Sequence, residues 1–165
     1  YVVGETFDEL AGSEYCACIG APGRRVPQVR ADTARATMEA LASVIAAGHV
    51  VACHDMSEGG LAVALAEMAF SGELGAEVEL SSVPLGESIS RDDIILFSES
   101  NSRFLVEVPP AHTAEFEAGM AGSPCARVGE VSGDGVVRAH GLNGSTALSA
   151  DIHELKAAWK RPLDW

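Results

Sequence analysis

Apolar residues recur at helical spacing in two segments of the chain. They lie three and four positions apart within residues 31–47 and again within residues 60–71, which places them on one face of a helix in each segment. Gly48 and Gly72 follow these segments and are expected to end the helices. The positions expected to be buried are Ala34, Met38, Leu41, Ile45, Leu61, Leu65 and Met68.

Short apolar or alternating segments predict the strands. Residues 49–53 (HVVAC) are nearly all apolar and predict a buried strand, and residues 76–80 alternate as a half-exposed strand does. Residues 126–131 and 136–140 are separated by Ser-Gly-Asp-Gly, a turn typical of a hairpin. The remaining expected elements are strands at 1–3, 104–108 and, less regularly, 15–19, a loop around 20–30, and helices at 113–120 and 152–159.

This order of elements predicts the α/β class, with a mixed β-sheet flanked by helices. The chain has 165 residues, of which 47% are hydrophobic and 21% charged, as expected for a single globular domain spanning residues 1–165. No apolar run approaches the roughly 20 residues of a membrane span, and no signal peptide is recognisable, so we expect a cytoplasmic protein. Because the chain begins directly in a strand-like segment, we expect it to be one domain of a larger protein.

The balance of charge is strongly acidic, with 11 basic and 24 acidic residues and a formal net charge of −13. Such a chain repels phosphate backbones, which argues against nucleic-acid binding. A small anionic ligand would need backbone N–H groups, a metal ion or an Arg supplied from elsewhere. The four Cys residues are expected to be free thiols, and Cys16 and Cys18, if they lie in a strand, share one face.

Residues 51–61 (VACHDMSEGGL) predict a ligand site where a strand leads into a helix. Ligands of α/β folds gather at the carboxyl ends of strands, and a helix N-terminus offers N–H groups to phosphate. The carboxylate of Asp55 suits Mg²⁺, and Gly59 and Gly60 would let a ligand approach the backbone. The alternative is structural, with Asp55 or Ser57 capping the helix and the glycines forming a turn.

His54 lies next to Asp55 and raises the question of acid–base catalysis. Adjacent strand residues point to opposite faces, so these two side chains are not expected to act as a pair. The chain also lacks a nucleophile motif such as Gly-x-Ser-x-Gly. We therefore assign no catalytic residue and expect His54 to pack or to orient a neighbour.

Two further polar segments could contribute to a site. In residues 96–104 (LFSESNSRF), Glu99 could hold a substrate hydroxyl or ammonium group and Arg103 could pair with a carboxylate or phosphate. The alternative for this segment is a solvated turn carrying a Glu99–Arg103 surface pair. Residues 4–15 (GETFDELAGSEY) hold several carboxylates, which more often form a helix start and a turn than a site.

Together these segments resemble a known family. HDMSEGGLAVALAEMA (54–69) is similar to the HDxSDGGLxxALAEMA signature of the large subunit of phosphoribosylformylglycinamidine synthase, and LFSESNSRFLVEV resembles its LFSESxxRFxV segment. GETFDELAGSEY resembles the GxTxxELGGSEY entry to its final domain, and residues 155–165 (LKAAWKRPLDW) resemble its closing residues. The matches occur in the family's order and span nearly the whole chain.

The resemblance implies the C-terminal domain of the aminoimidazole ribonucleotide synthetase-like fold, in the second half of such a subunit. The family uses ATP and Mg²⁺ to convert formylglycinamide ribonucleotide and glutamine-derived ammonia into formylglycinamidine ribonucleotide. A glutaminase subunit and a small bridging subunit assist it, and the N-type domain of the same subunit completes each site. In the second half of the subunit the nucleotide site is auxiliary.

By resemblance, Asp55 is a Mg²⁺–nucleotide contact, and Glu99, Ser100 and Asn101 match the position of a substrate loop. With the local arguments above, the predicted nucleotide or phosphate contacts are Asp55, Ser57, Gly59 and Gly60, and the predicted loop counterparts are Glu99, Ser100, Asn101 and Arg103. Separated from its N-type domain, the chain is expected to lack synthase activity, to bind ATP weakly, and to self-associate through an exposed apolar face.

Two other interpretations of the sequence remain open. One is the C-type domain of a related ATP-dependent enzyme, such as aminoimidazole ribonucleotide synthetase, selenophosphate synthetase or thiamine-monophosphate kinase. The LFSESNSRF segment and the GGSEY-like entry argue against these enzymes. The other is a non-catalytic α/β interaction module without a ligand, which a nucleotide titration would distinguish.

Overall fold

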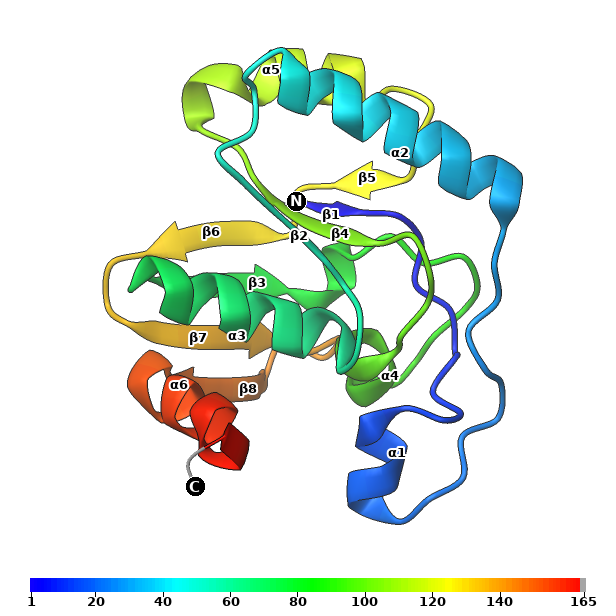
Figure 1. Cartoon of the computed structure of the whole chain (residues 1–165), viewed down its shortest axis with the longest axis vertical. Coiled ribbons are helices and arrows are strands. Elements are labelled where there is room, and N and C mark those ends of the chain that lie inside the picture. The colour runs from blue at the N-terminus through cyan, green and yellow to red at the C-terminus, as the bar shows by residue number, and fades with distance from the viewer. Residues whose placement is uncertain (164–165) are drawn as a thin grey trace.

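A computed structural model describes residues 1–163; Asp164 and Trp165, part of the segment that resembles the family's closing residues, lie outside the described chain. The described strands form two four-stranded sheets (Figure 1). The first sheet is antiparallel, in the order β2 (Ala52–Asp55), β4 (Phe104–Glu107), β1 (Val2–Val3) and β5 (Cys125–Ala126). The second sheet is mixed, in the order β6 (Gly129–Ser132), β3 (Gly75–Glu79), β7 (Val136–His140) and β8 (Thr146–Asp151).

Helices cover both sheets, which confirms the predicted α/β class. They are α1 (Glu14–Ile19), α2 (Ala31–Ala46), α3 (Gly60–Gly72), α4 (Asp92–Phe97), α5 (Thr113–Gly119) and α6 (Ile152–Lys160). Short 3₁₀ turns occur at Leu80–Ser82, Pro110–His112 and Arg161–Leu163. Among the described helices, none is long and apolar enough to cross a membrane.

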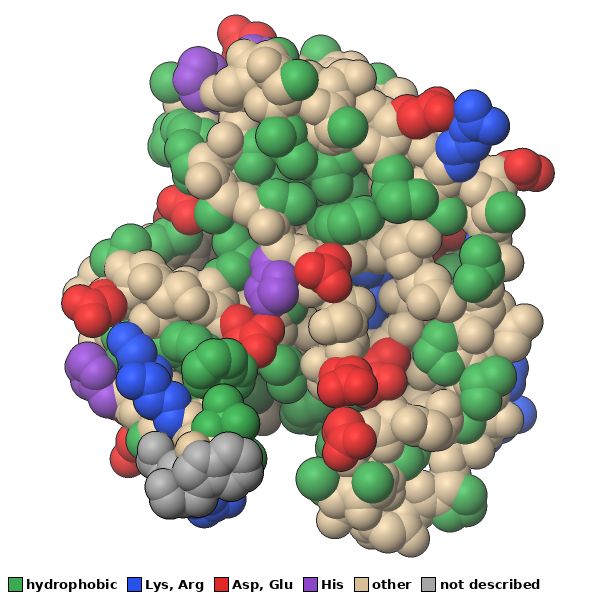
Figure 2. Space-filling model, in the orientation of Figure 1, with side chains coloured by type: hydrophobic (Ala, Val, Ile, Leu, Met, Phe, Trp, Pro, Cys, Tyr) green, Lys and Arg blue, Asp and Glu red, His purple; other side chains and the backbone are tan. Residues whose placement is uncertain are grey.

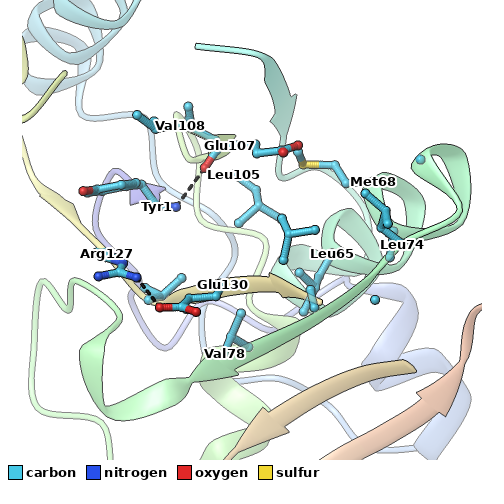
Figure 3. A pocket seen from close by; sticks show the side chains of 18 of the residues that line it. Tyr1, Leu65, Met68, Leu74, Val78, Leu105, Glu107, Val108, Arg127 and Glu130 are labelled. Carbon is cyan, nitrogen blue, oxygen red and sulfur yellow. Dashed lines mark hydrogen bonds and ion pairs between the residues drawn. The ribbon is translucent and has the colours of Figure 1, made fainter. Parts of the chain in front are cut away.

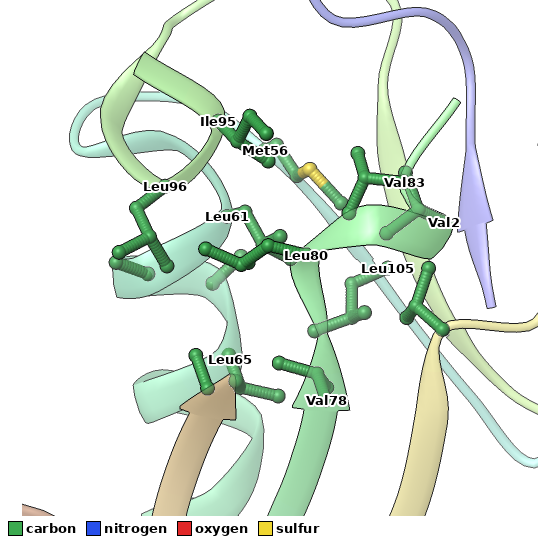
Figure 4. Packing of buried hydrophobic residues seen from close by; sticks show 14 of the residues in the cluster. Val2, Met56, Leu61, Leu65, Val78, Leu80, Val83, Ile95, Leu96 and Leu105 are labelled. Atoms are coloured by element: carbon green, nitrogen blue, oxygen red, sulfur yellow. The ribbon is translucent and has the colours of Figure 1, made fainter. Parts of the chain in front are cut away.

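The hydrophobic core has two parts. The larger part joins α3 and α4 to both sheets, and Figure 4 shows Leu61, Leu65, Val78 and Leu105 meeting at its centre. The smaller part lies where α2 and α5 cover the first sheet, as Figure 1 shows at the top of the molecule. It consists of Val3, Leu41, Val44, Val106, Phe116 and Met120. Each fully buried leucine contributes about 1.5–3 kcal/mol to this packing.

Helix α2 begins and ends within a residue of its predicted bounds, but its buried face is rotated. Met38 and Ile45, expected in the core, are 45% and 42% exposed. The buried residues of this helix are Ala34, Thr37, Leu41 and Val44. Spacings of three, four and three satisfy helical periodicity as well as the predicted set does, so the pattern predicts the helix but not which face packs.

Helix α3 agrees better with the prediction. Leu61 and Leu65 are buried, and Met68 is only partly buried against the main core. The strand before it differs from the prediction, because β2 starts three residues later than expected and lies at the edge of its sheet. The predicted burial of residues 49–53 is also wrong, because Val51 is 62% exposed and Cys53 is exposed.

Residues 15–19 form helix α1, so the predicted strand there is wrong. Ser13 caps the helix, since its Oγ accepts a hydrogen bond from Cys16 N at 3.2 Å, and Gly20 ends it with a φ of 65°. In a helix, residues two positions apart point in different directions. Cys16 is therefore buried and Cys18 exposed, instead of sharing a face. All four thiols are free, as expected.

The predicted hairpin between residues 126–131 and 136–140 is also wrong, because β3 lies between β6 and β7. The turn that connects β6 to β7 passes around Gly75 at the start of β3. A β-carbon at Gly75 would lie 2.5 Å from both Ser132 Oγ and Val136 O, so only glycine fits there. The turn residues were recognised correctly, but the strand inserted between the two arms comes from a distant part of the chain.

Candidate functional site

The two most distinctive segments of the sequence meet in space. Strand β2 runs antiparallel to β4, with Asp55 opposite Phe104, so the turn after β2 lies beside the turn before β4. Met56 N donates a hydrogen bond to Arg103 O at 2.9 Å and continues this pairing past the end of the strand. Residues 55–60 and 98–103 therefore form one corner of the molecule, next to the start of α3.

Asp55 occupies the position that the sequence predicts, at the carboxyl end of β2 and shortly before α3 begins at Gly60. Its side chain is 68% exposed. Figure 2 shows acidic side chains and a histidine gathered on this face, where β2 leads toward α3. An exposed carboxylate beside a helix N-terminus can accept a metal ion without being desolvated first.

The side chain of His54 lies near that of Asp55, although adjacent strand residues usually point to opposite faces. Its Nδ1 lies 3.5 Å from Asp55 Oδ1, and its Nε2 lies 2.7 Å from Glu67 Oε2 on α3. Alternation between faces orients side chains inside a strand, but Asp55 is the last strand residue and turns back toward His54. The two side chains therefore lie closer together than strand alternation suggests, and an orienting role for His54 fits its contacts.

The N-terminus of α3 is capped by a residue distant in sequence. Gly59 N donates to Glu99 Oε1 at 2.9 Å, and Gly60 N donates to Ser57 O at 3.1 Å. The Ser57 side chain is exposed. The two glycine N–H groups that the sequence assigned to phosphate thus have partners within the chain. A carboxylate on a helix N-terminus occupies the place where a phosphate would otherwise bind.

Both glycines have structural reasons to be glycine. Gly59 and Gly60 have φ values of 78° and 60°, in the left-handed region that other residues avoid. A β-carbon on Gly60 would lie 2.3 Å from Ser98 O, and one on Gly59 would lie 2.2 Å from a methyl group of Val63. The close approach that these glycines allow is made by the chain itself.

Arg103 is a structural residue and does not face solvent. Its side chain is buried, with the residue 1% exposed. Nη1 donates to Thr6 Oγ1 at 2.8 Å and Nε donates to Ser100 O at 3.2 Å, while Nη2 donates to Ser98 O. Burial lowers the pKa of this guanidinium to about 10, so it remains charged at neutral pH. The alternative of a surface pair with Glu99 is wrong, and these three donors of Arg103 bond to the chain itself.

Ser98 and Ser100 bind the backbone of the N-terminal segment. Ser98 Oγ donates to Phe7 O at 2.7 Å, and Phe7 N donates to Ser100 Oγ at 3.1 Å. Both serines are fully buried, whereas Asn101 is exposed at the tip of the turn. The three resembling segments therefore converge, because residues 98–103 connect Thr6 and Phe7 to the start of α3.

Sequence reasoning missed the environment of Glu9, which it treated as part of a solvated charge run. The Glu9 side chain is fully buried, and Arg30 Nη2 donates to its Oε1 at 2.9 Å. The guanidinium of Arg30 also lies 3.4 Å from the centre of the Phe7 ring. Nothing in the spacing of the acidic residues distinguishes Glu9 from its exposed neighbours, so only the fold reveals this pair.

Asp55 is the metal ligand that the sequence predicts in this corner, and no cluster of ligands surrounds it in the described residues. Within residues 1–163, no three His, Cys, Asp or Glu side chains are arranged to hold a metal ion. A groove of about 440 Å³ opens elsewhere, between the two sheets, and neither Asp55 nor Glu99 lines it. Figure 3 shows Leu65, Met68 and Val78 lining this groove beside the Arg127–Glu130 ion pair. Its apolar lining does not suit a nucleotide phosphate.

Comparison with known proteins places these features in context. The model of the family "AIR synthase related protein, C-terminal domain" matches residues 2–142. The chain is 39% identical to the phosphoribosylformylglycinamidine synthase subunit PurL of Moorella thermoacetica over 98% of its own length and 21% of that protein. It is 39% identical to PurL of Methanopyrus kandleri over 99% of its own length and 22% of that protein. The chain thus spans about a fifth of these relatives.

Solved structures show the same fold. Thermotoga maritima PurL complexed with ATP is similar with a TM-score of 0.71 and 25% identity, over 93% of this chain and 24% of that one. The PurLQS structure from the same organism is similar with a TM-score of 0.70 and 23% identity, over 93% of this chain and 25% of that one. The described chain therefore has the architecture of one region of these larger proteins.

Proposed function

The chain belongs to the AIR synthase related proteins, whose C-terminal domain it matches, and we propose on this premise that it serves a phosphoribosylformylglycinamidine synthase of the PurL type. The parent protein converts formylglycinamide ribonucleotide and ammonia from glutamine into formylglycinamidine ribonucleotide, using ATP. The 39% identity to PurL subunits over nearly the whole chain supports this assignment. The described chain supplies one metal–nucleotide contact, and the reaction itself takes place elsewhere in the protein.

The observation that carries this proposal is the exposed carboxylate of Asp55 at the end of β2. Mg²⁺ binds through one or two protein carboxylates and completes its shell with phosphate oxygens and water. A side chain that is 68% exposed fits that role, because substrate phosphates can reach a metal bound to it. When Mg²⁺ is bound there, it supplies positive charge to the nucleotide phosphates, which the acidic chain cannot supply.

The arrangement favours binding through a metal over direct binding of phosphate. Glu99 already accepts the Gly59 N–H, and the chain carries a formal net charge of −13. A bare phosphate at the start of α3 would have to displace a carboxylate and would meet like charge. A Mg²⁺–nucleotide complex bound to Asp55 leaves Glu99 in place, and the metal ion reduces the like-charge repulsion. Gly59 and Gly60 then shape the turn, and Ser57 remains available at its surface.

Fewer residues of the 98–103 turn can contact a substrate than the sequence suggests. Ser100 and Arg103 are buried and hold the turn, so contact with a substrate is left to Asn101, which is exposed, and to Glu99, which is partly buried. No residue of this corner has the geometry of an acid–base pair acting on a bound amide. We therefore assign this chain a role in binding and positioning, with no catalytic residue of its own.

The proposed site is completed by other parts of the assembly. One metal ligand, Asp55, is too little to hold Mg²⁺ and a triphosphate, so an N-type domain of the same subunit provides the remaining contacts. A glutaminase and a small bridging subunit complete the complex, in keeping with the PurLQS assembly of the Thermotoga protein. A cytoplasmic location belongs to the same proposal.

The isolated 165-residue chain is expected to have no synthase activity and to bind Mg·ATP weakly or not at all. Phosphoryl chemistry depends on holding triphosphate, metal and substrate together, and this chain offers one candidate ligand. Exposed apolar groups, such as those of the groove between the sheets, would favour self-association. Calorimetry with Mg·ATP tests this, and a dissociation constant in the low micromolar range would show that the chain binds nucleotide by itself.

The contact itself is tested in the full-length protein by titration with Mg·ATP. The Asp55→Asn variant is expected to weaken one class of bound nucleotide at least about 10-fold, since replacing a charged metal ligand by an amide removes at least ~1.4 kcal/mol of binding. Asp32→Asn, which neutralises an exposed carboxylate on α2, is the matched control and should bind as the parent does. Unchanged binding by Asp55→Asn refutes the proposed contact.

A further inference from the structure

The last part of the described chain lies outside the family match yet reaches the candidate site. The family model ends at residue 142, whereas β8 and α6 follow it. Strand β8 pairs antiparallel with β7 at the edge of the second sheet. Helix α6 then turns back and lies beside α3, as Figure 1 shows at the lower left. This C-terminal unit, β8 with α6, is therefore attached to the helix that starts at the site.

Contacts between α6 and α3 run toward the start of α3. Near the end of α3, Lys156 Nζ lies 3.9 Å from Glu73 Oε1. One turn further along α6, the ring of Trp159 packs against that of Phe70, with centroids 5.6 Å apart and planes tilted by 51°. The indole Nε1 of Trp159 then donates to Glu67 Oε1 at 2.9 Å. The two helices are antiparallel, and Trp159 reaches the middle of α3.

Glu67 joins this contact to the site. One of its oxygens accepts the indole N–H, and the other lies 2.7 Å from Nε2 of His54. Glu67 thus contacts both the indole of Trp159 and the imidazole of His54. The imidazole is thereby fixed in orientation, with its Nδ1 3.5 Å from Asp55 Oδ1. A continuous series of contacts links α6 to the proposed metal ligand.

We propose that Trp159 and Glu67 are positioning residues, which hold His54 and through it the carboxylate of Asp55 in the orientation that binds the metal–nucleotide complex. This inference rests on the proposed function of Asp55. The side chain needs such support because it is 68% exposed and ends a strand that has one neighbour. Residues behind a metal ligand commonly set its orientation and change affinity when they are removed.

A different role for the same contacts is to attach α6 to the rest of the domain. Trp159 packs on Phe70, so removal of the whole side chain would disturb both roles at once. Two variants together separate them: Trp159→Phe, which keeps an aromatic ring but removes the N–H and part of the indole, and Glu67→Gln, which leaves the Trp159–Phe70 packing in place. The matched control is Lys156→Met, which removes the other polar contact between α6 and α3 without touching Glu67.

The experiment measures Mg·ATP binding by these variants in the full-length protein, for the nucleotide class that Asp55→Asn weakens. Trp159→Phe is expected to raise the dissociation constant about fivefold, the loss that goes with one hydrogen bond. Glu67→Gln is expected to act in the same direction without changing the aromatic packing. Lys156→Met should stay within about twofold of the parent, as a mostly exposed ion pair does.

A double variant tests whether Trp159 acts on binding through Asp55. In an Asp55→Asn background, Trp159→Phe should cause no further loss, because the two changes act on the same contact. A full fivefold loss in that background, or unchanged binding by both Trp159→Phe and Glu67→Gln in the parent, overturns the positioning role and leaves the proposed function intact. Unchanged binding by Asp55→Asn alone overturns the proposed function, and the positioning role with it.

Discussion

Residues 55–60 and 98–103 lie against each other, but they use their polar side chains in opposite ways. In the first segment Asp55, Ser57 and Glu58 face solvent. In the second, Ser98, Ser100 and Arg103 are at most 1% exposed and bond to the chain itself. Both segments resemble the same family. Resemblance in a motif therefore does not show whether its residues meet a ligand or hold the residues that do.

In the proposed function, Asp55 of the exposed segment contacts the ligand and the buried segment supports it. Arg103 ties Thr6 to the 98–100 turn, and Glu99 from that turn caps the helix that follows Asp55. Changes in residues 98–103 should therefore act first on stability. Changes in the exposed part of residues 55–60 should act first on ligand binding.

The largest effect is expected from Arg103→Leu. Leucine fills part of the volume but leaves Ser98 O, Ser100 O and Thr6 Oγ1 without their donor in a buried place. The free energy of unfolding should fall by ~3–5 kcal/mol, as it does when one partner of a buried charged network is removed. Urea unfolding of the 165-residue chain measures it, and a loss below about 1 kcal/mol would mean that Arg103 is not the support described.

Gly60→Ala is expected to have the next largest effect, although it lies in the exposed segment. The new β-carbon would sit at a φ of 60° and 2.3 Å from Ser98 O, so the two segments would have to separate. The left-handed conformation alone costs about 1–2 kcal/mol, and the clash adds to it.

The control for this change lies at the other end of α3. A β-carbon on Gly72 would meet no neighbouring segment within 4 Å, and this glycine has no positive φ, so Gly72→Ala should be neutral or stabilise by up to ~1 kcal/mol. Unfolding by urea compares the two variants. Equal effects at the two ends would contradict the close approach of Gly60 to Ser98.

A matched pair of serines gives the smallest difference. Ser98→Ala removes a buried hydroxyl that donates to Phe7 O at 2.7 Å, and about 1–2 kcal/mol of stability should be lost. Ser57→Ala alters an exposed side chain and should stay within ~0.5 kcal/mol. Thermal unfolding of both variants under identical conditions measures the difference. A larger loss for Ser57→Ala would reverse the comparison.

Local patterns in the sequence predicted much of the fold. Helical periodicity placed α2 and α3, and alternation placed β3. The strand predicted at residues 15–19 could have been recognised as a helix from its caps, Ser13 and Gly20. The rotation of α2 and the insertion of β3 between β6 and β7 could not, because each depends on packing between distant segments.

Some features of the candidate site could also be predicted from local sequence, and others could not. The position of Asp55 followed from a strand that ends before a glycine turn, which is local information. The burial of Arg103 did not follow, because its partners Thr6 and Ser98 are brought to it by the fold. Charged residues are usually exposed, so a buried Arg is predicted poorly from sequence wherever its partners are distant or are backbone carbonyls.

The central claim is that Asp55 binds ligand and does not support the fold, and one variant tests both halves of it. Asp55→Asn should leave the unfolding free energy of the ligand-free 165-residue chain within about 0.5 kcal/mol of the parent, since the side chain is exposed. In the full-length protein it should weaken one class of Mg·ATP binding at least about 10-fold and lower thermal stability only when nucleotide is present. A variant that unfolds more easily without ligand, or that binds Mg·ATP as the parent does, would contradict the account.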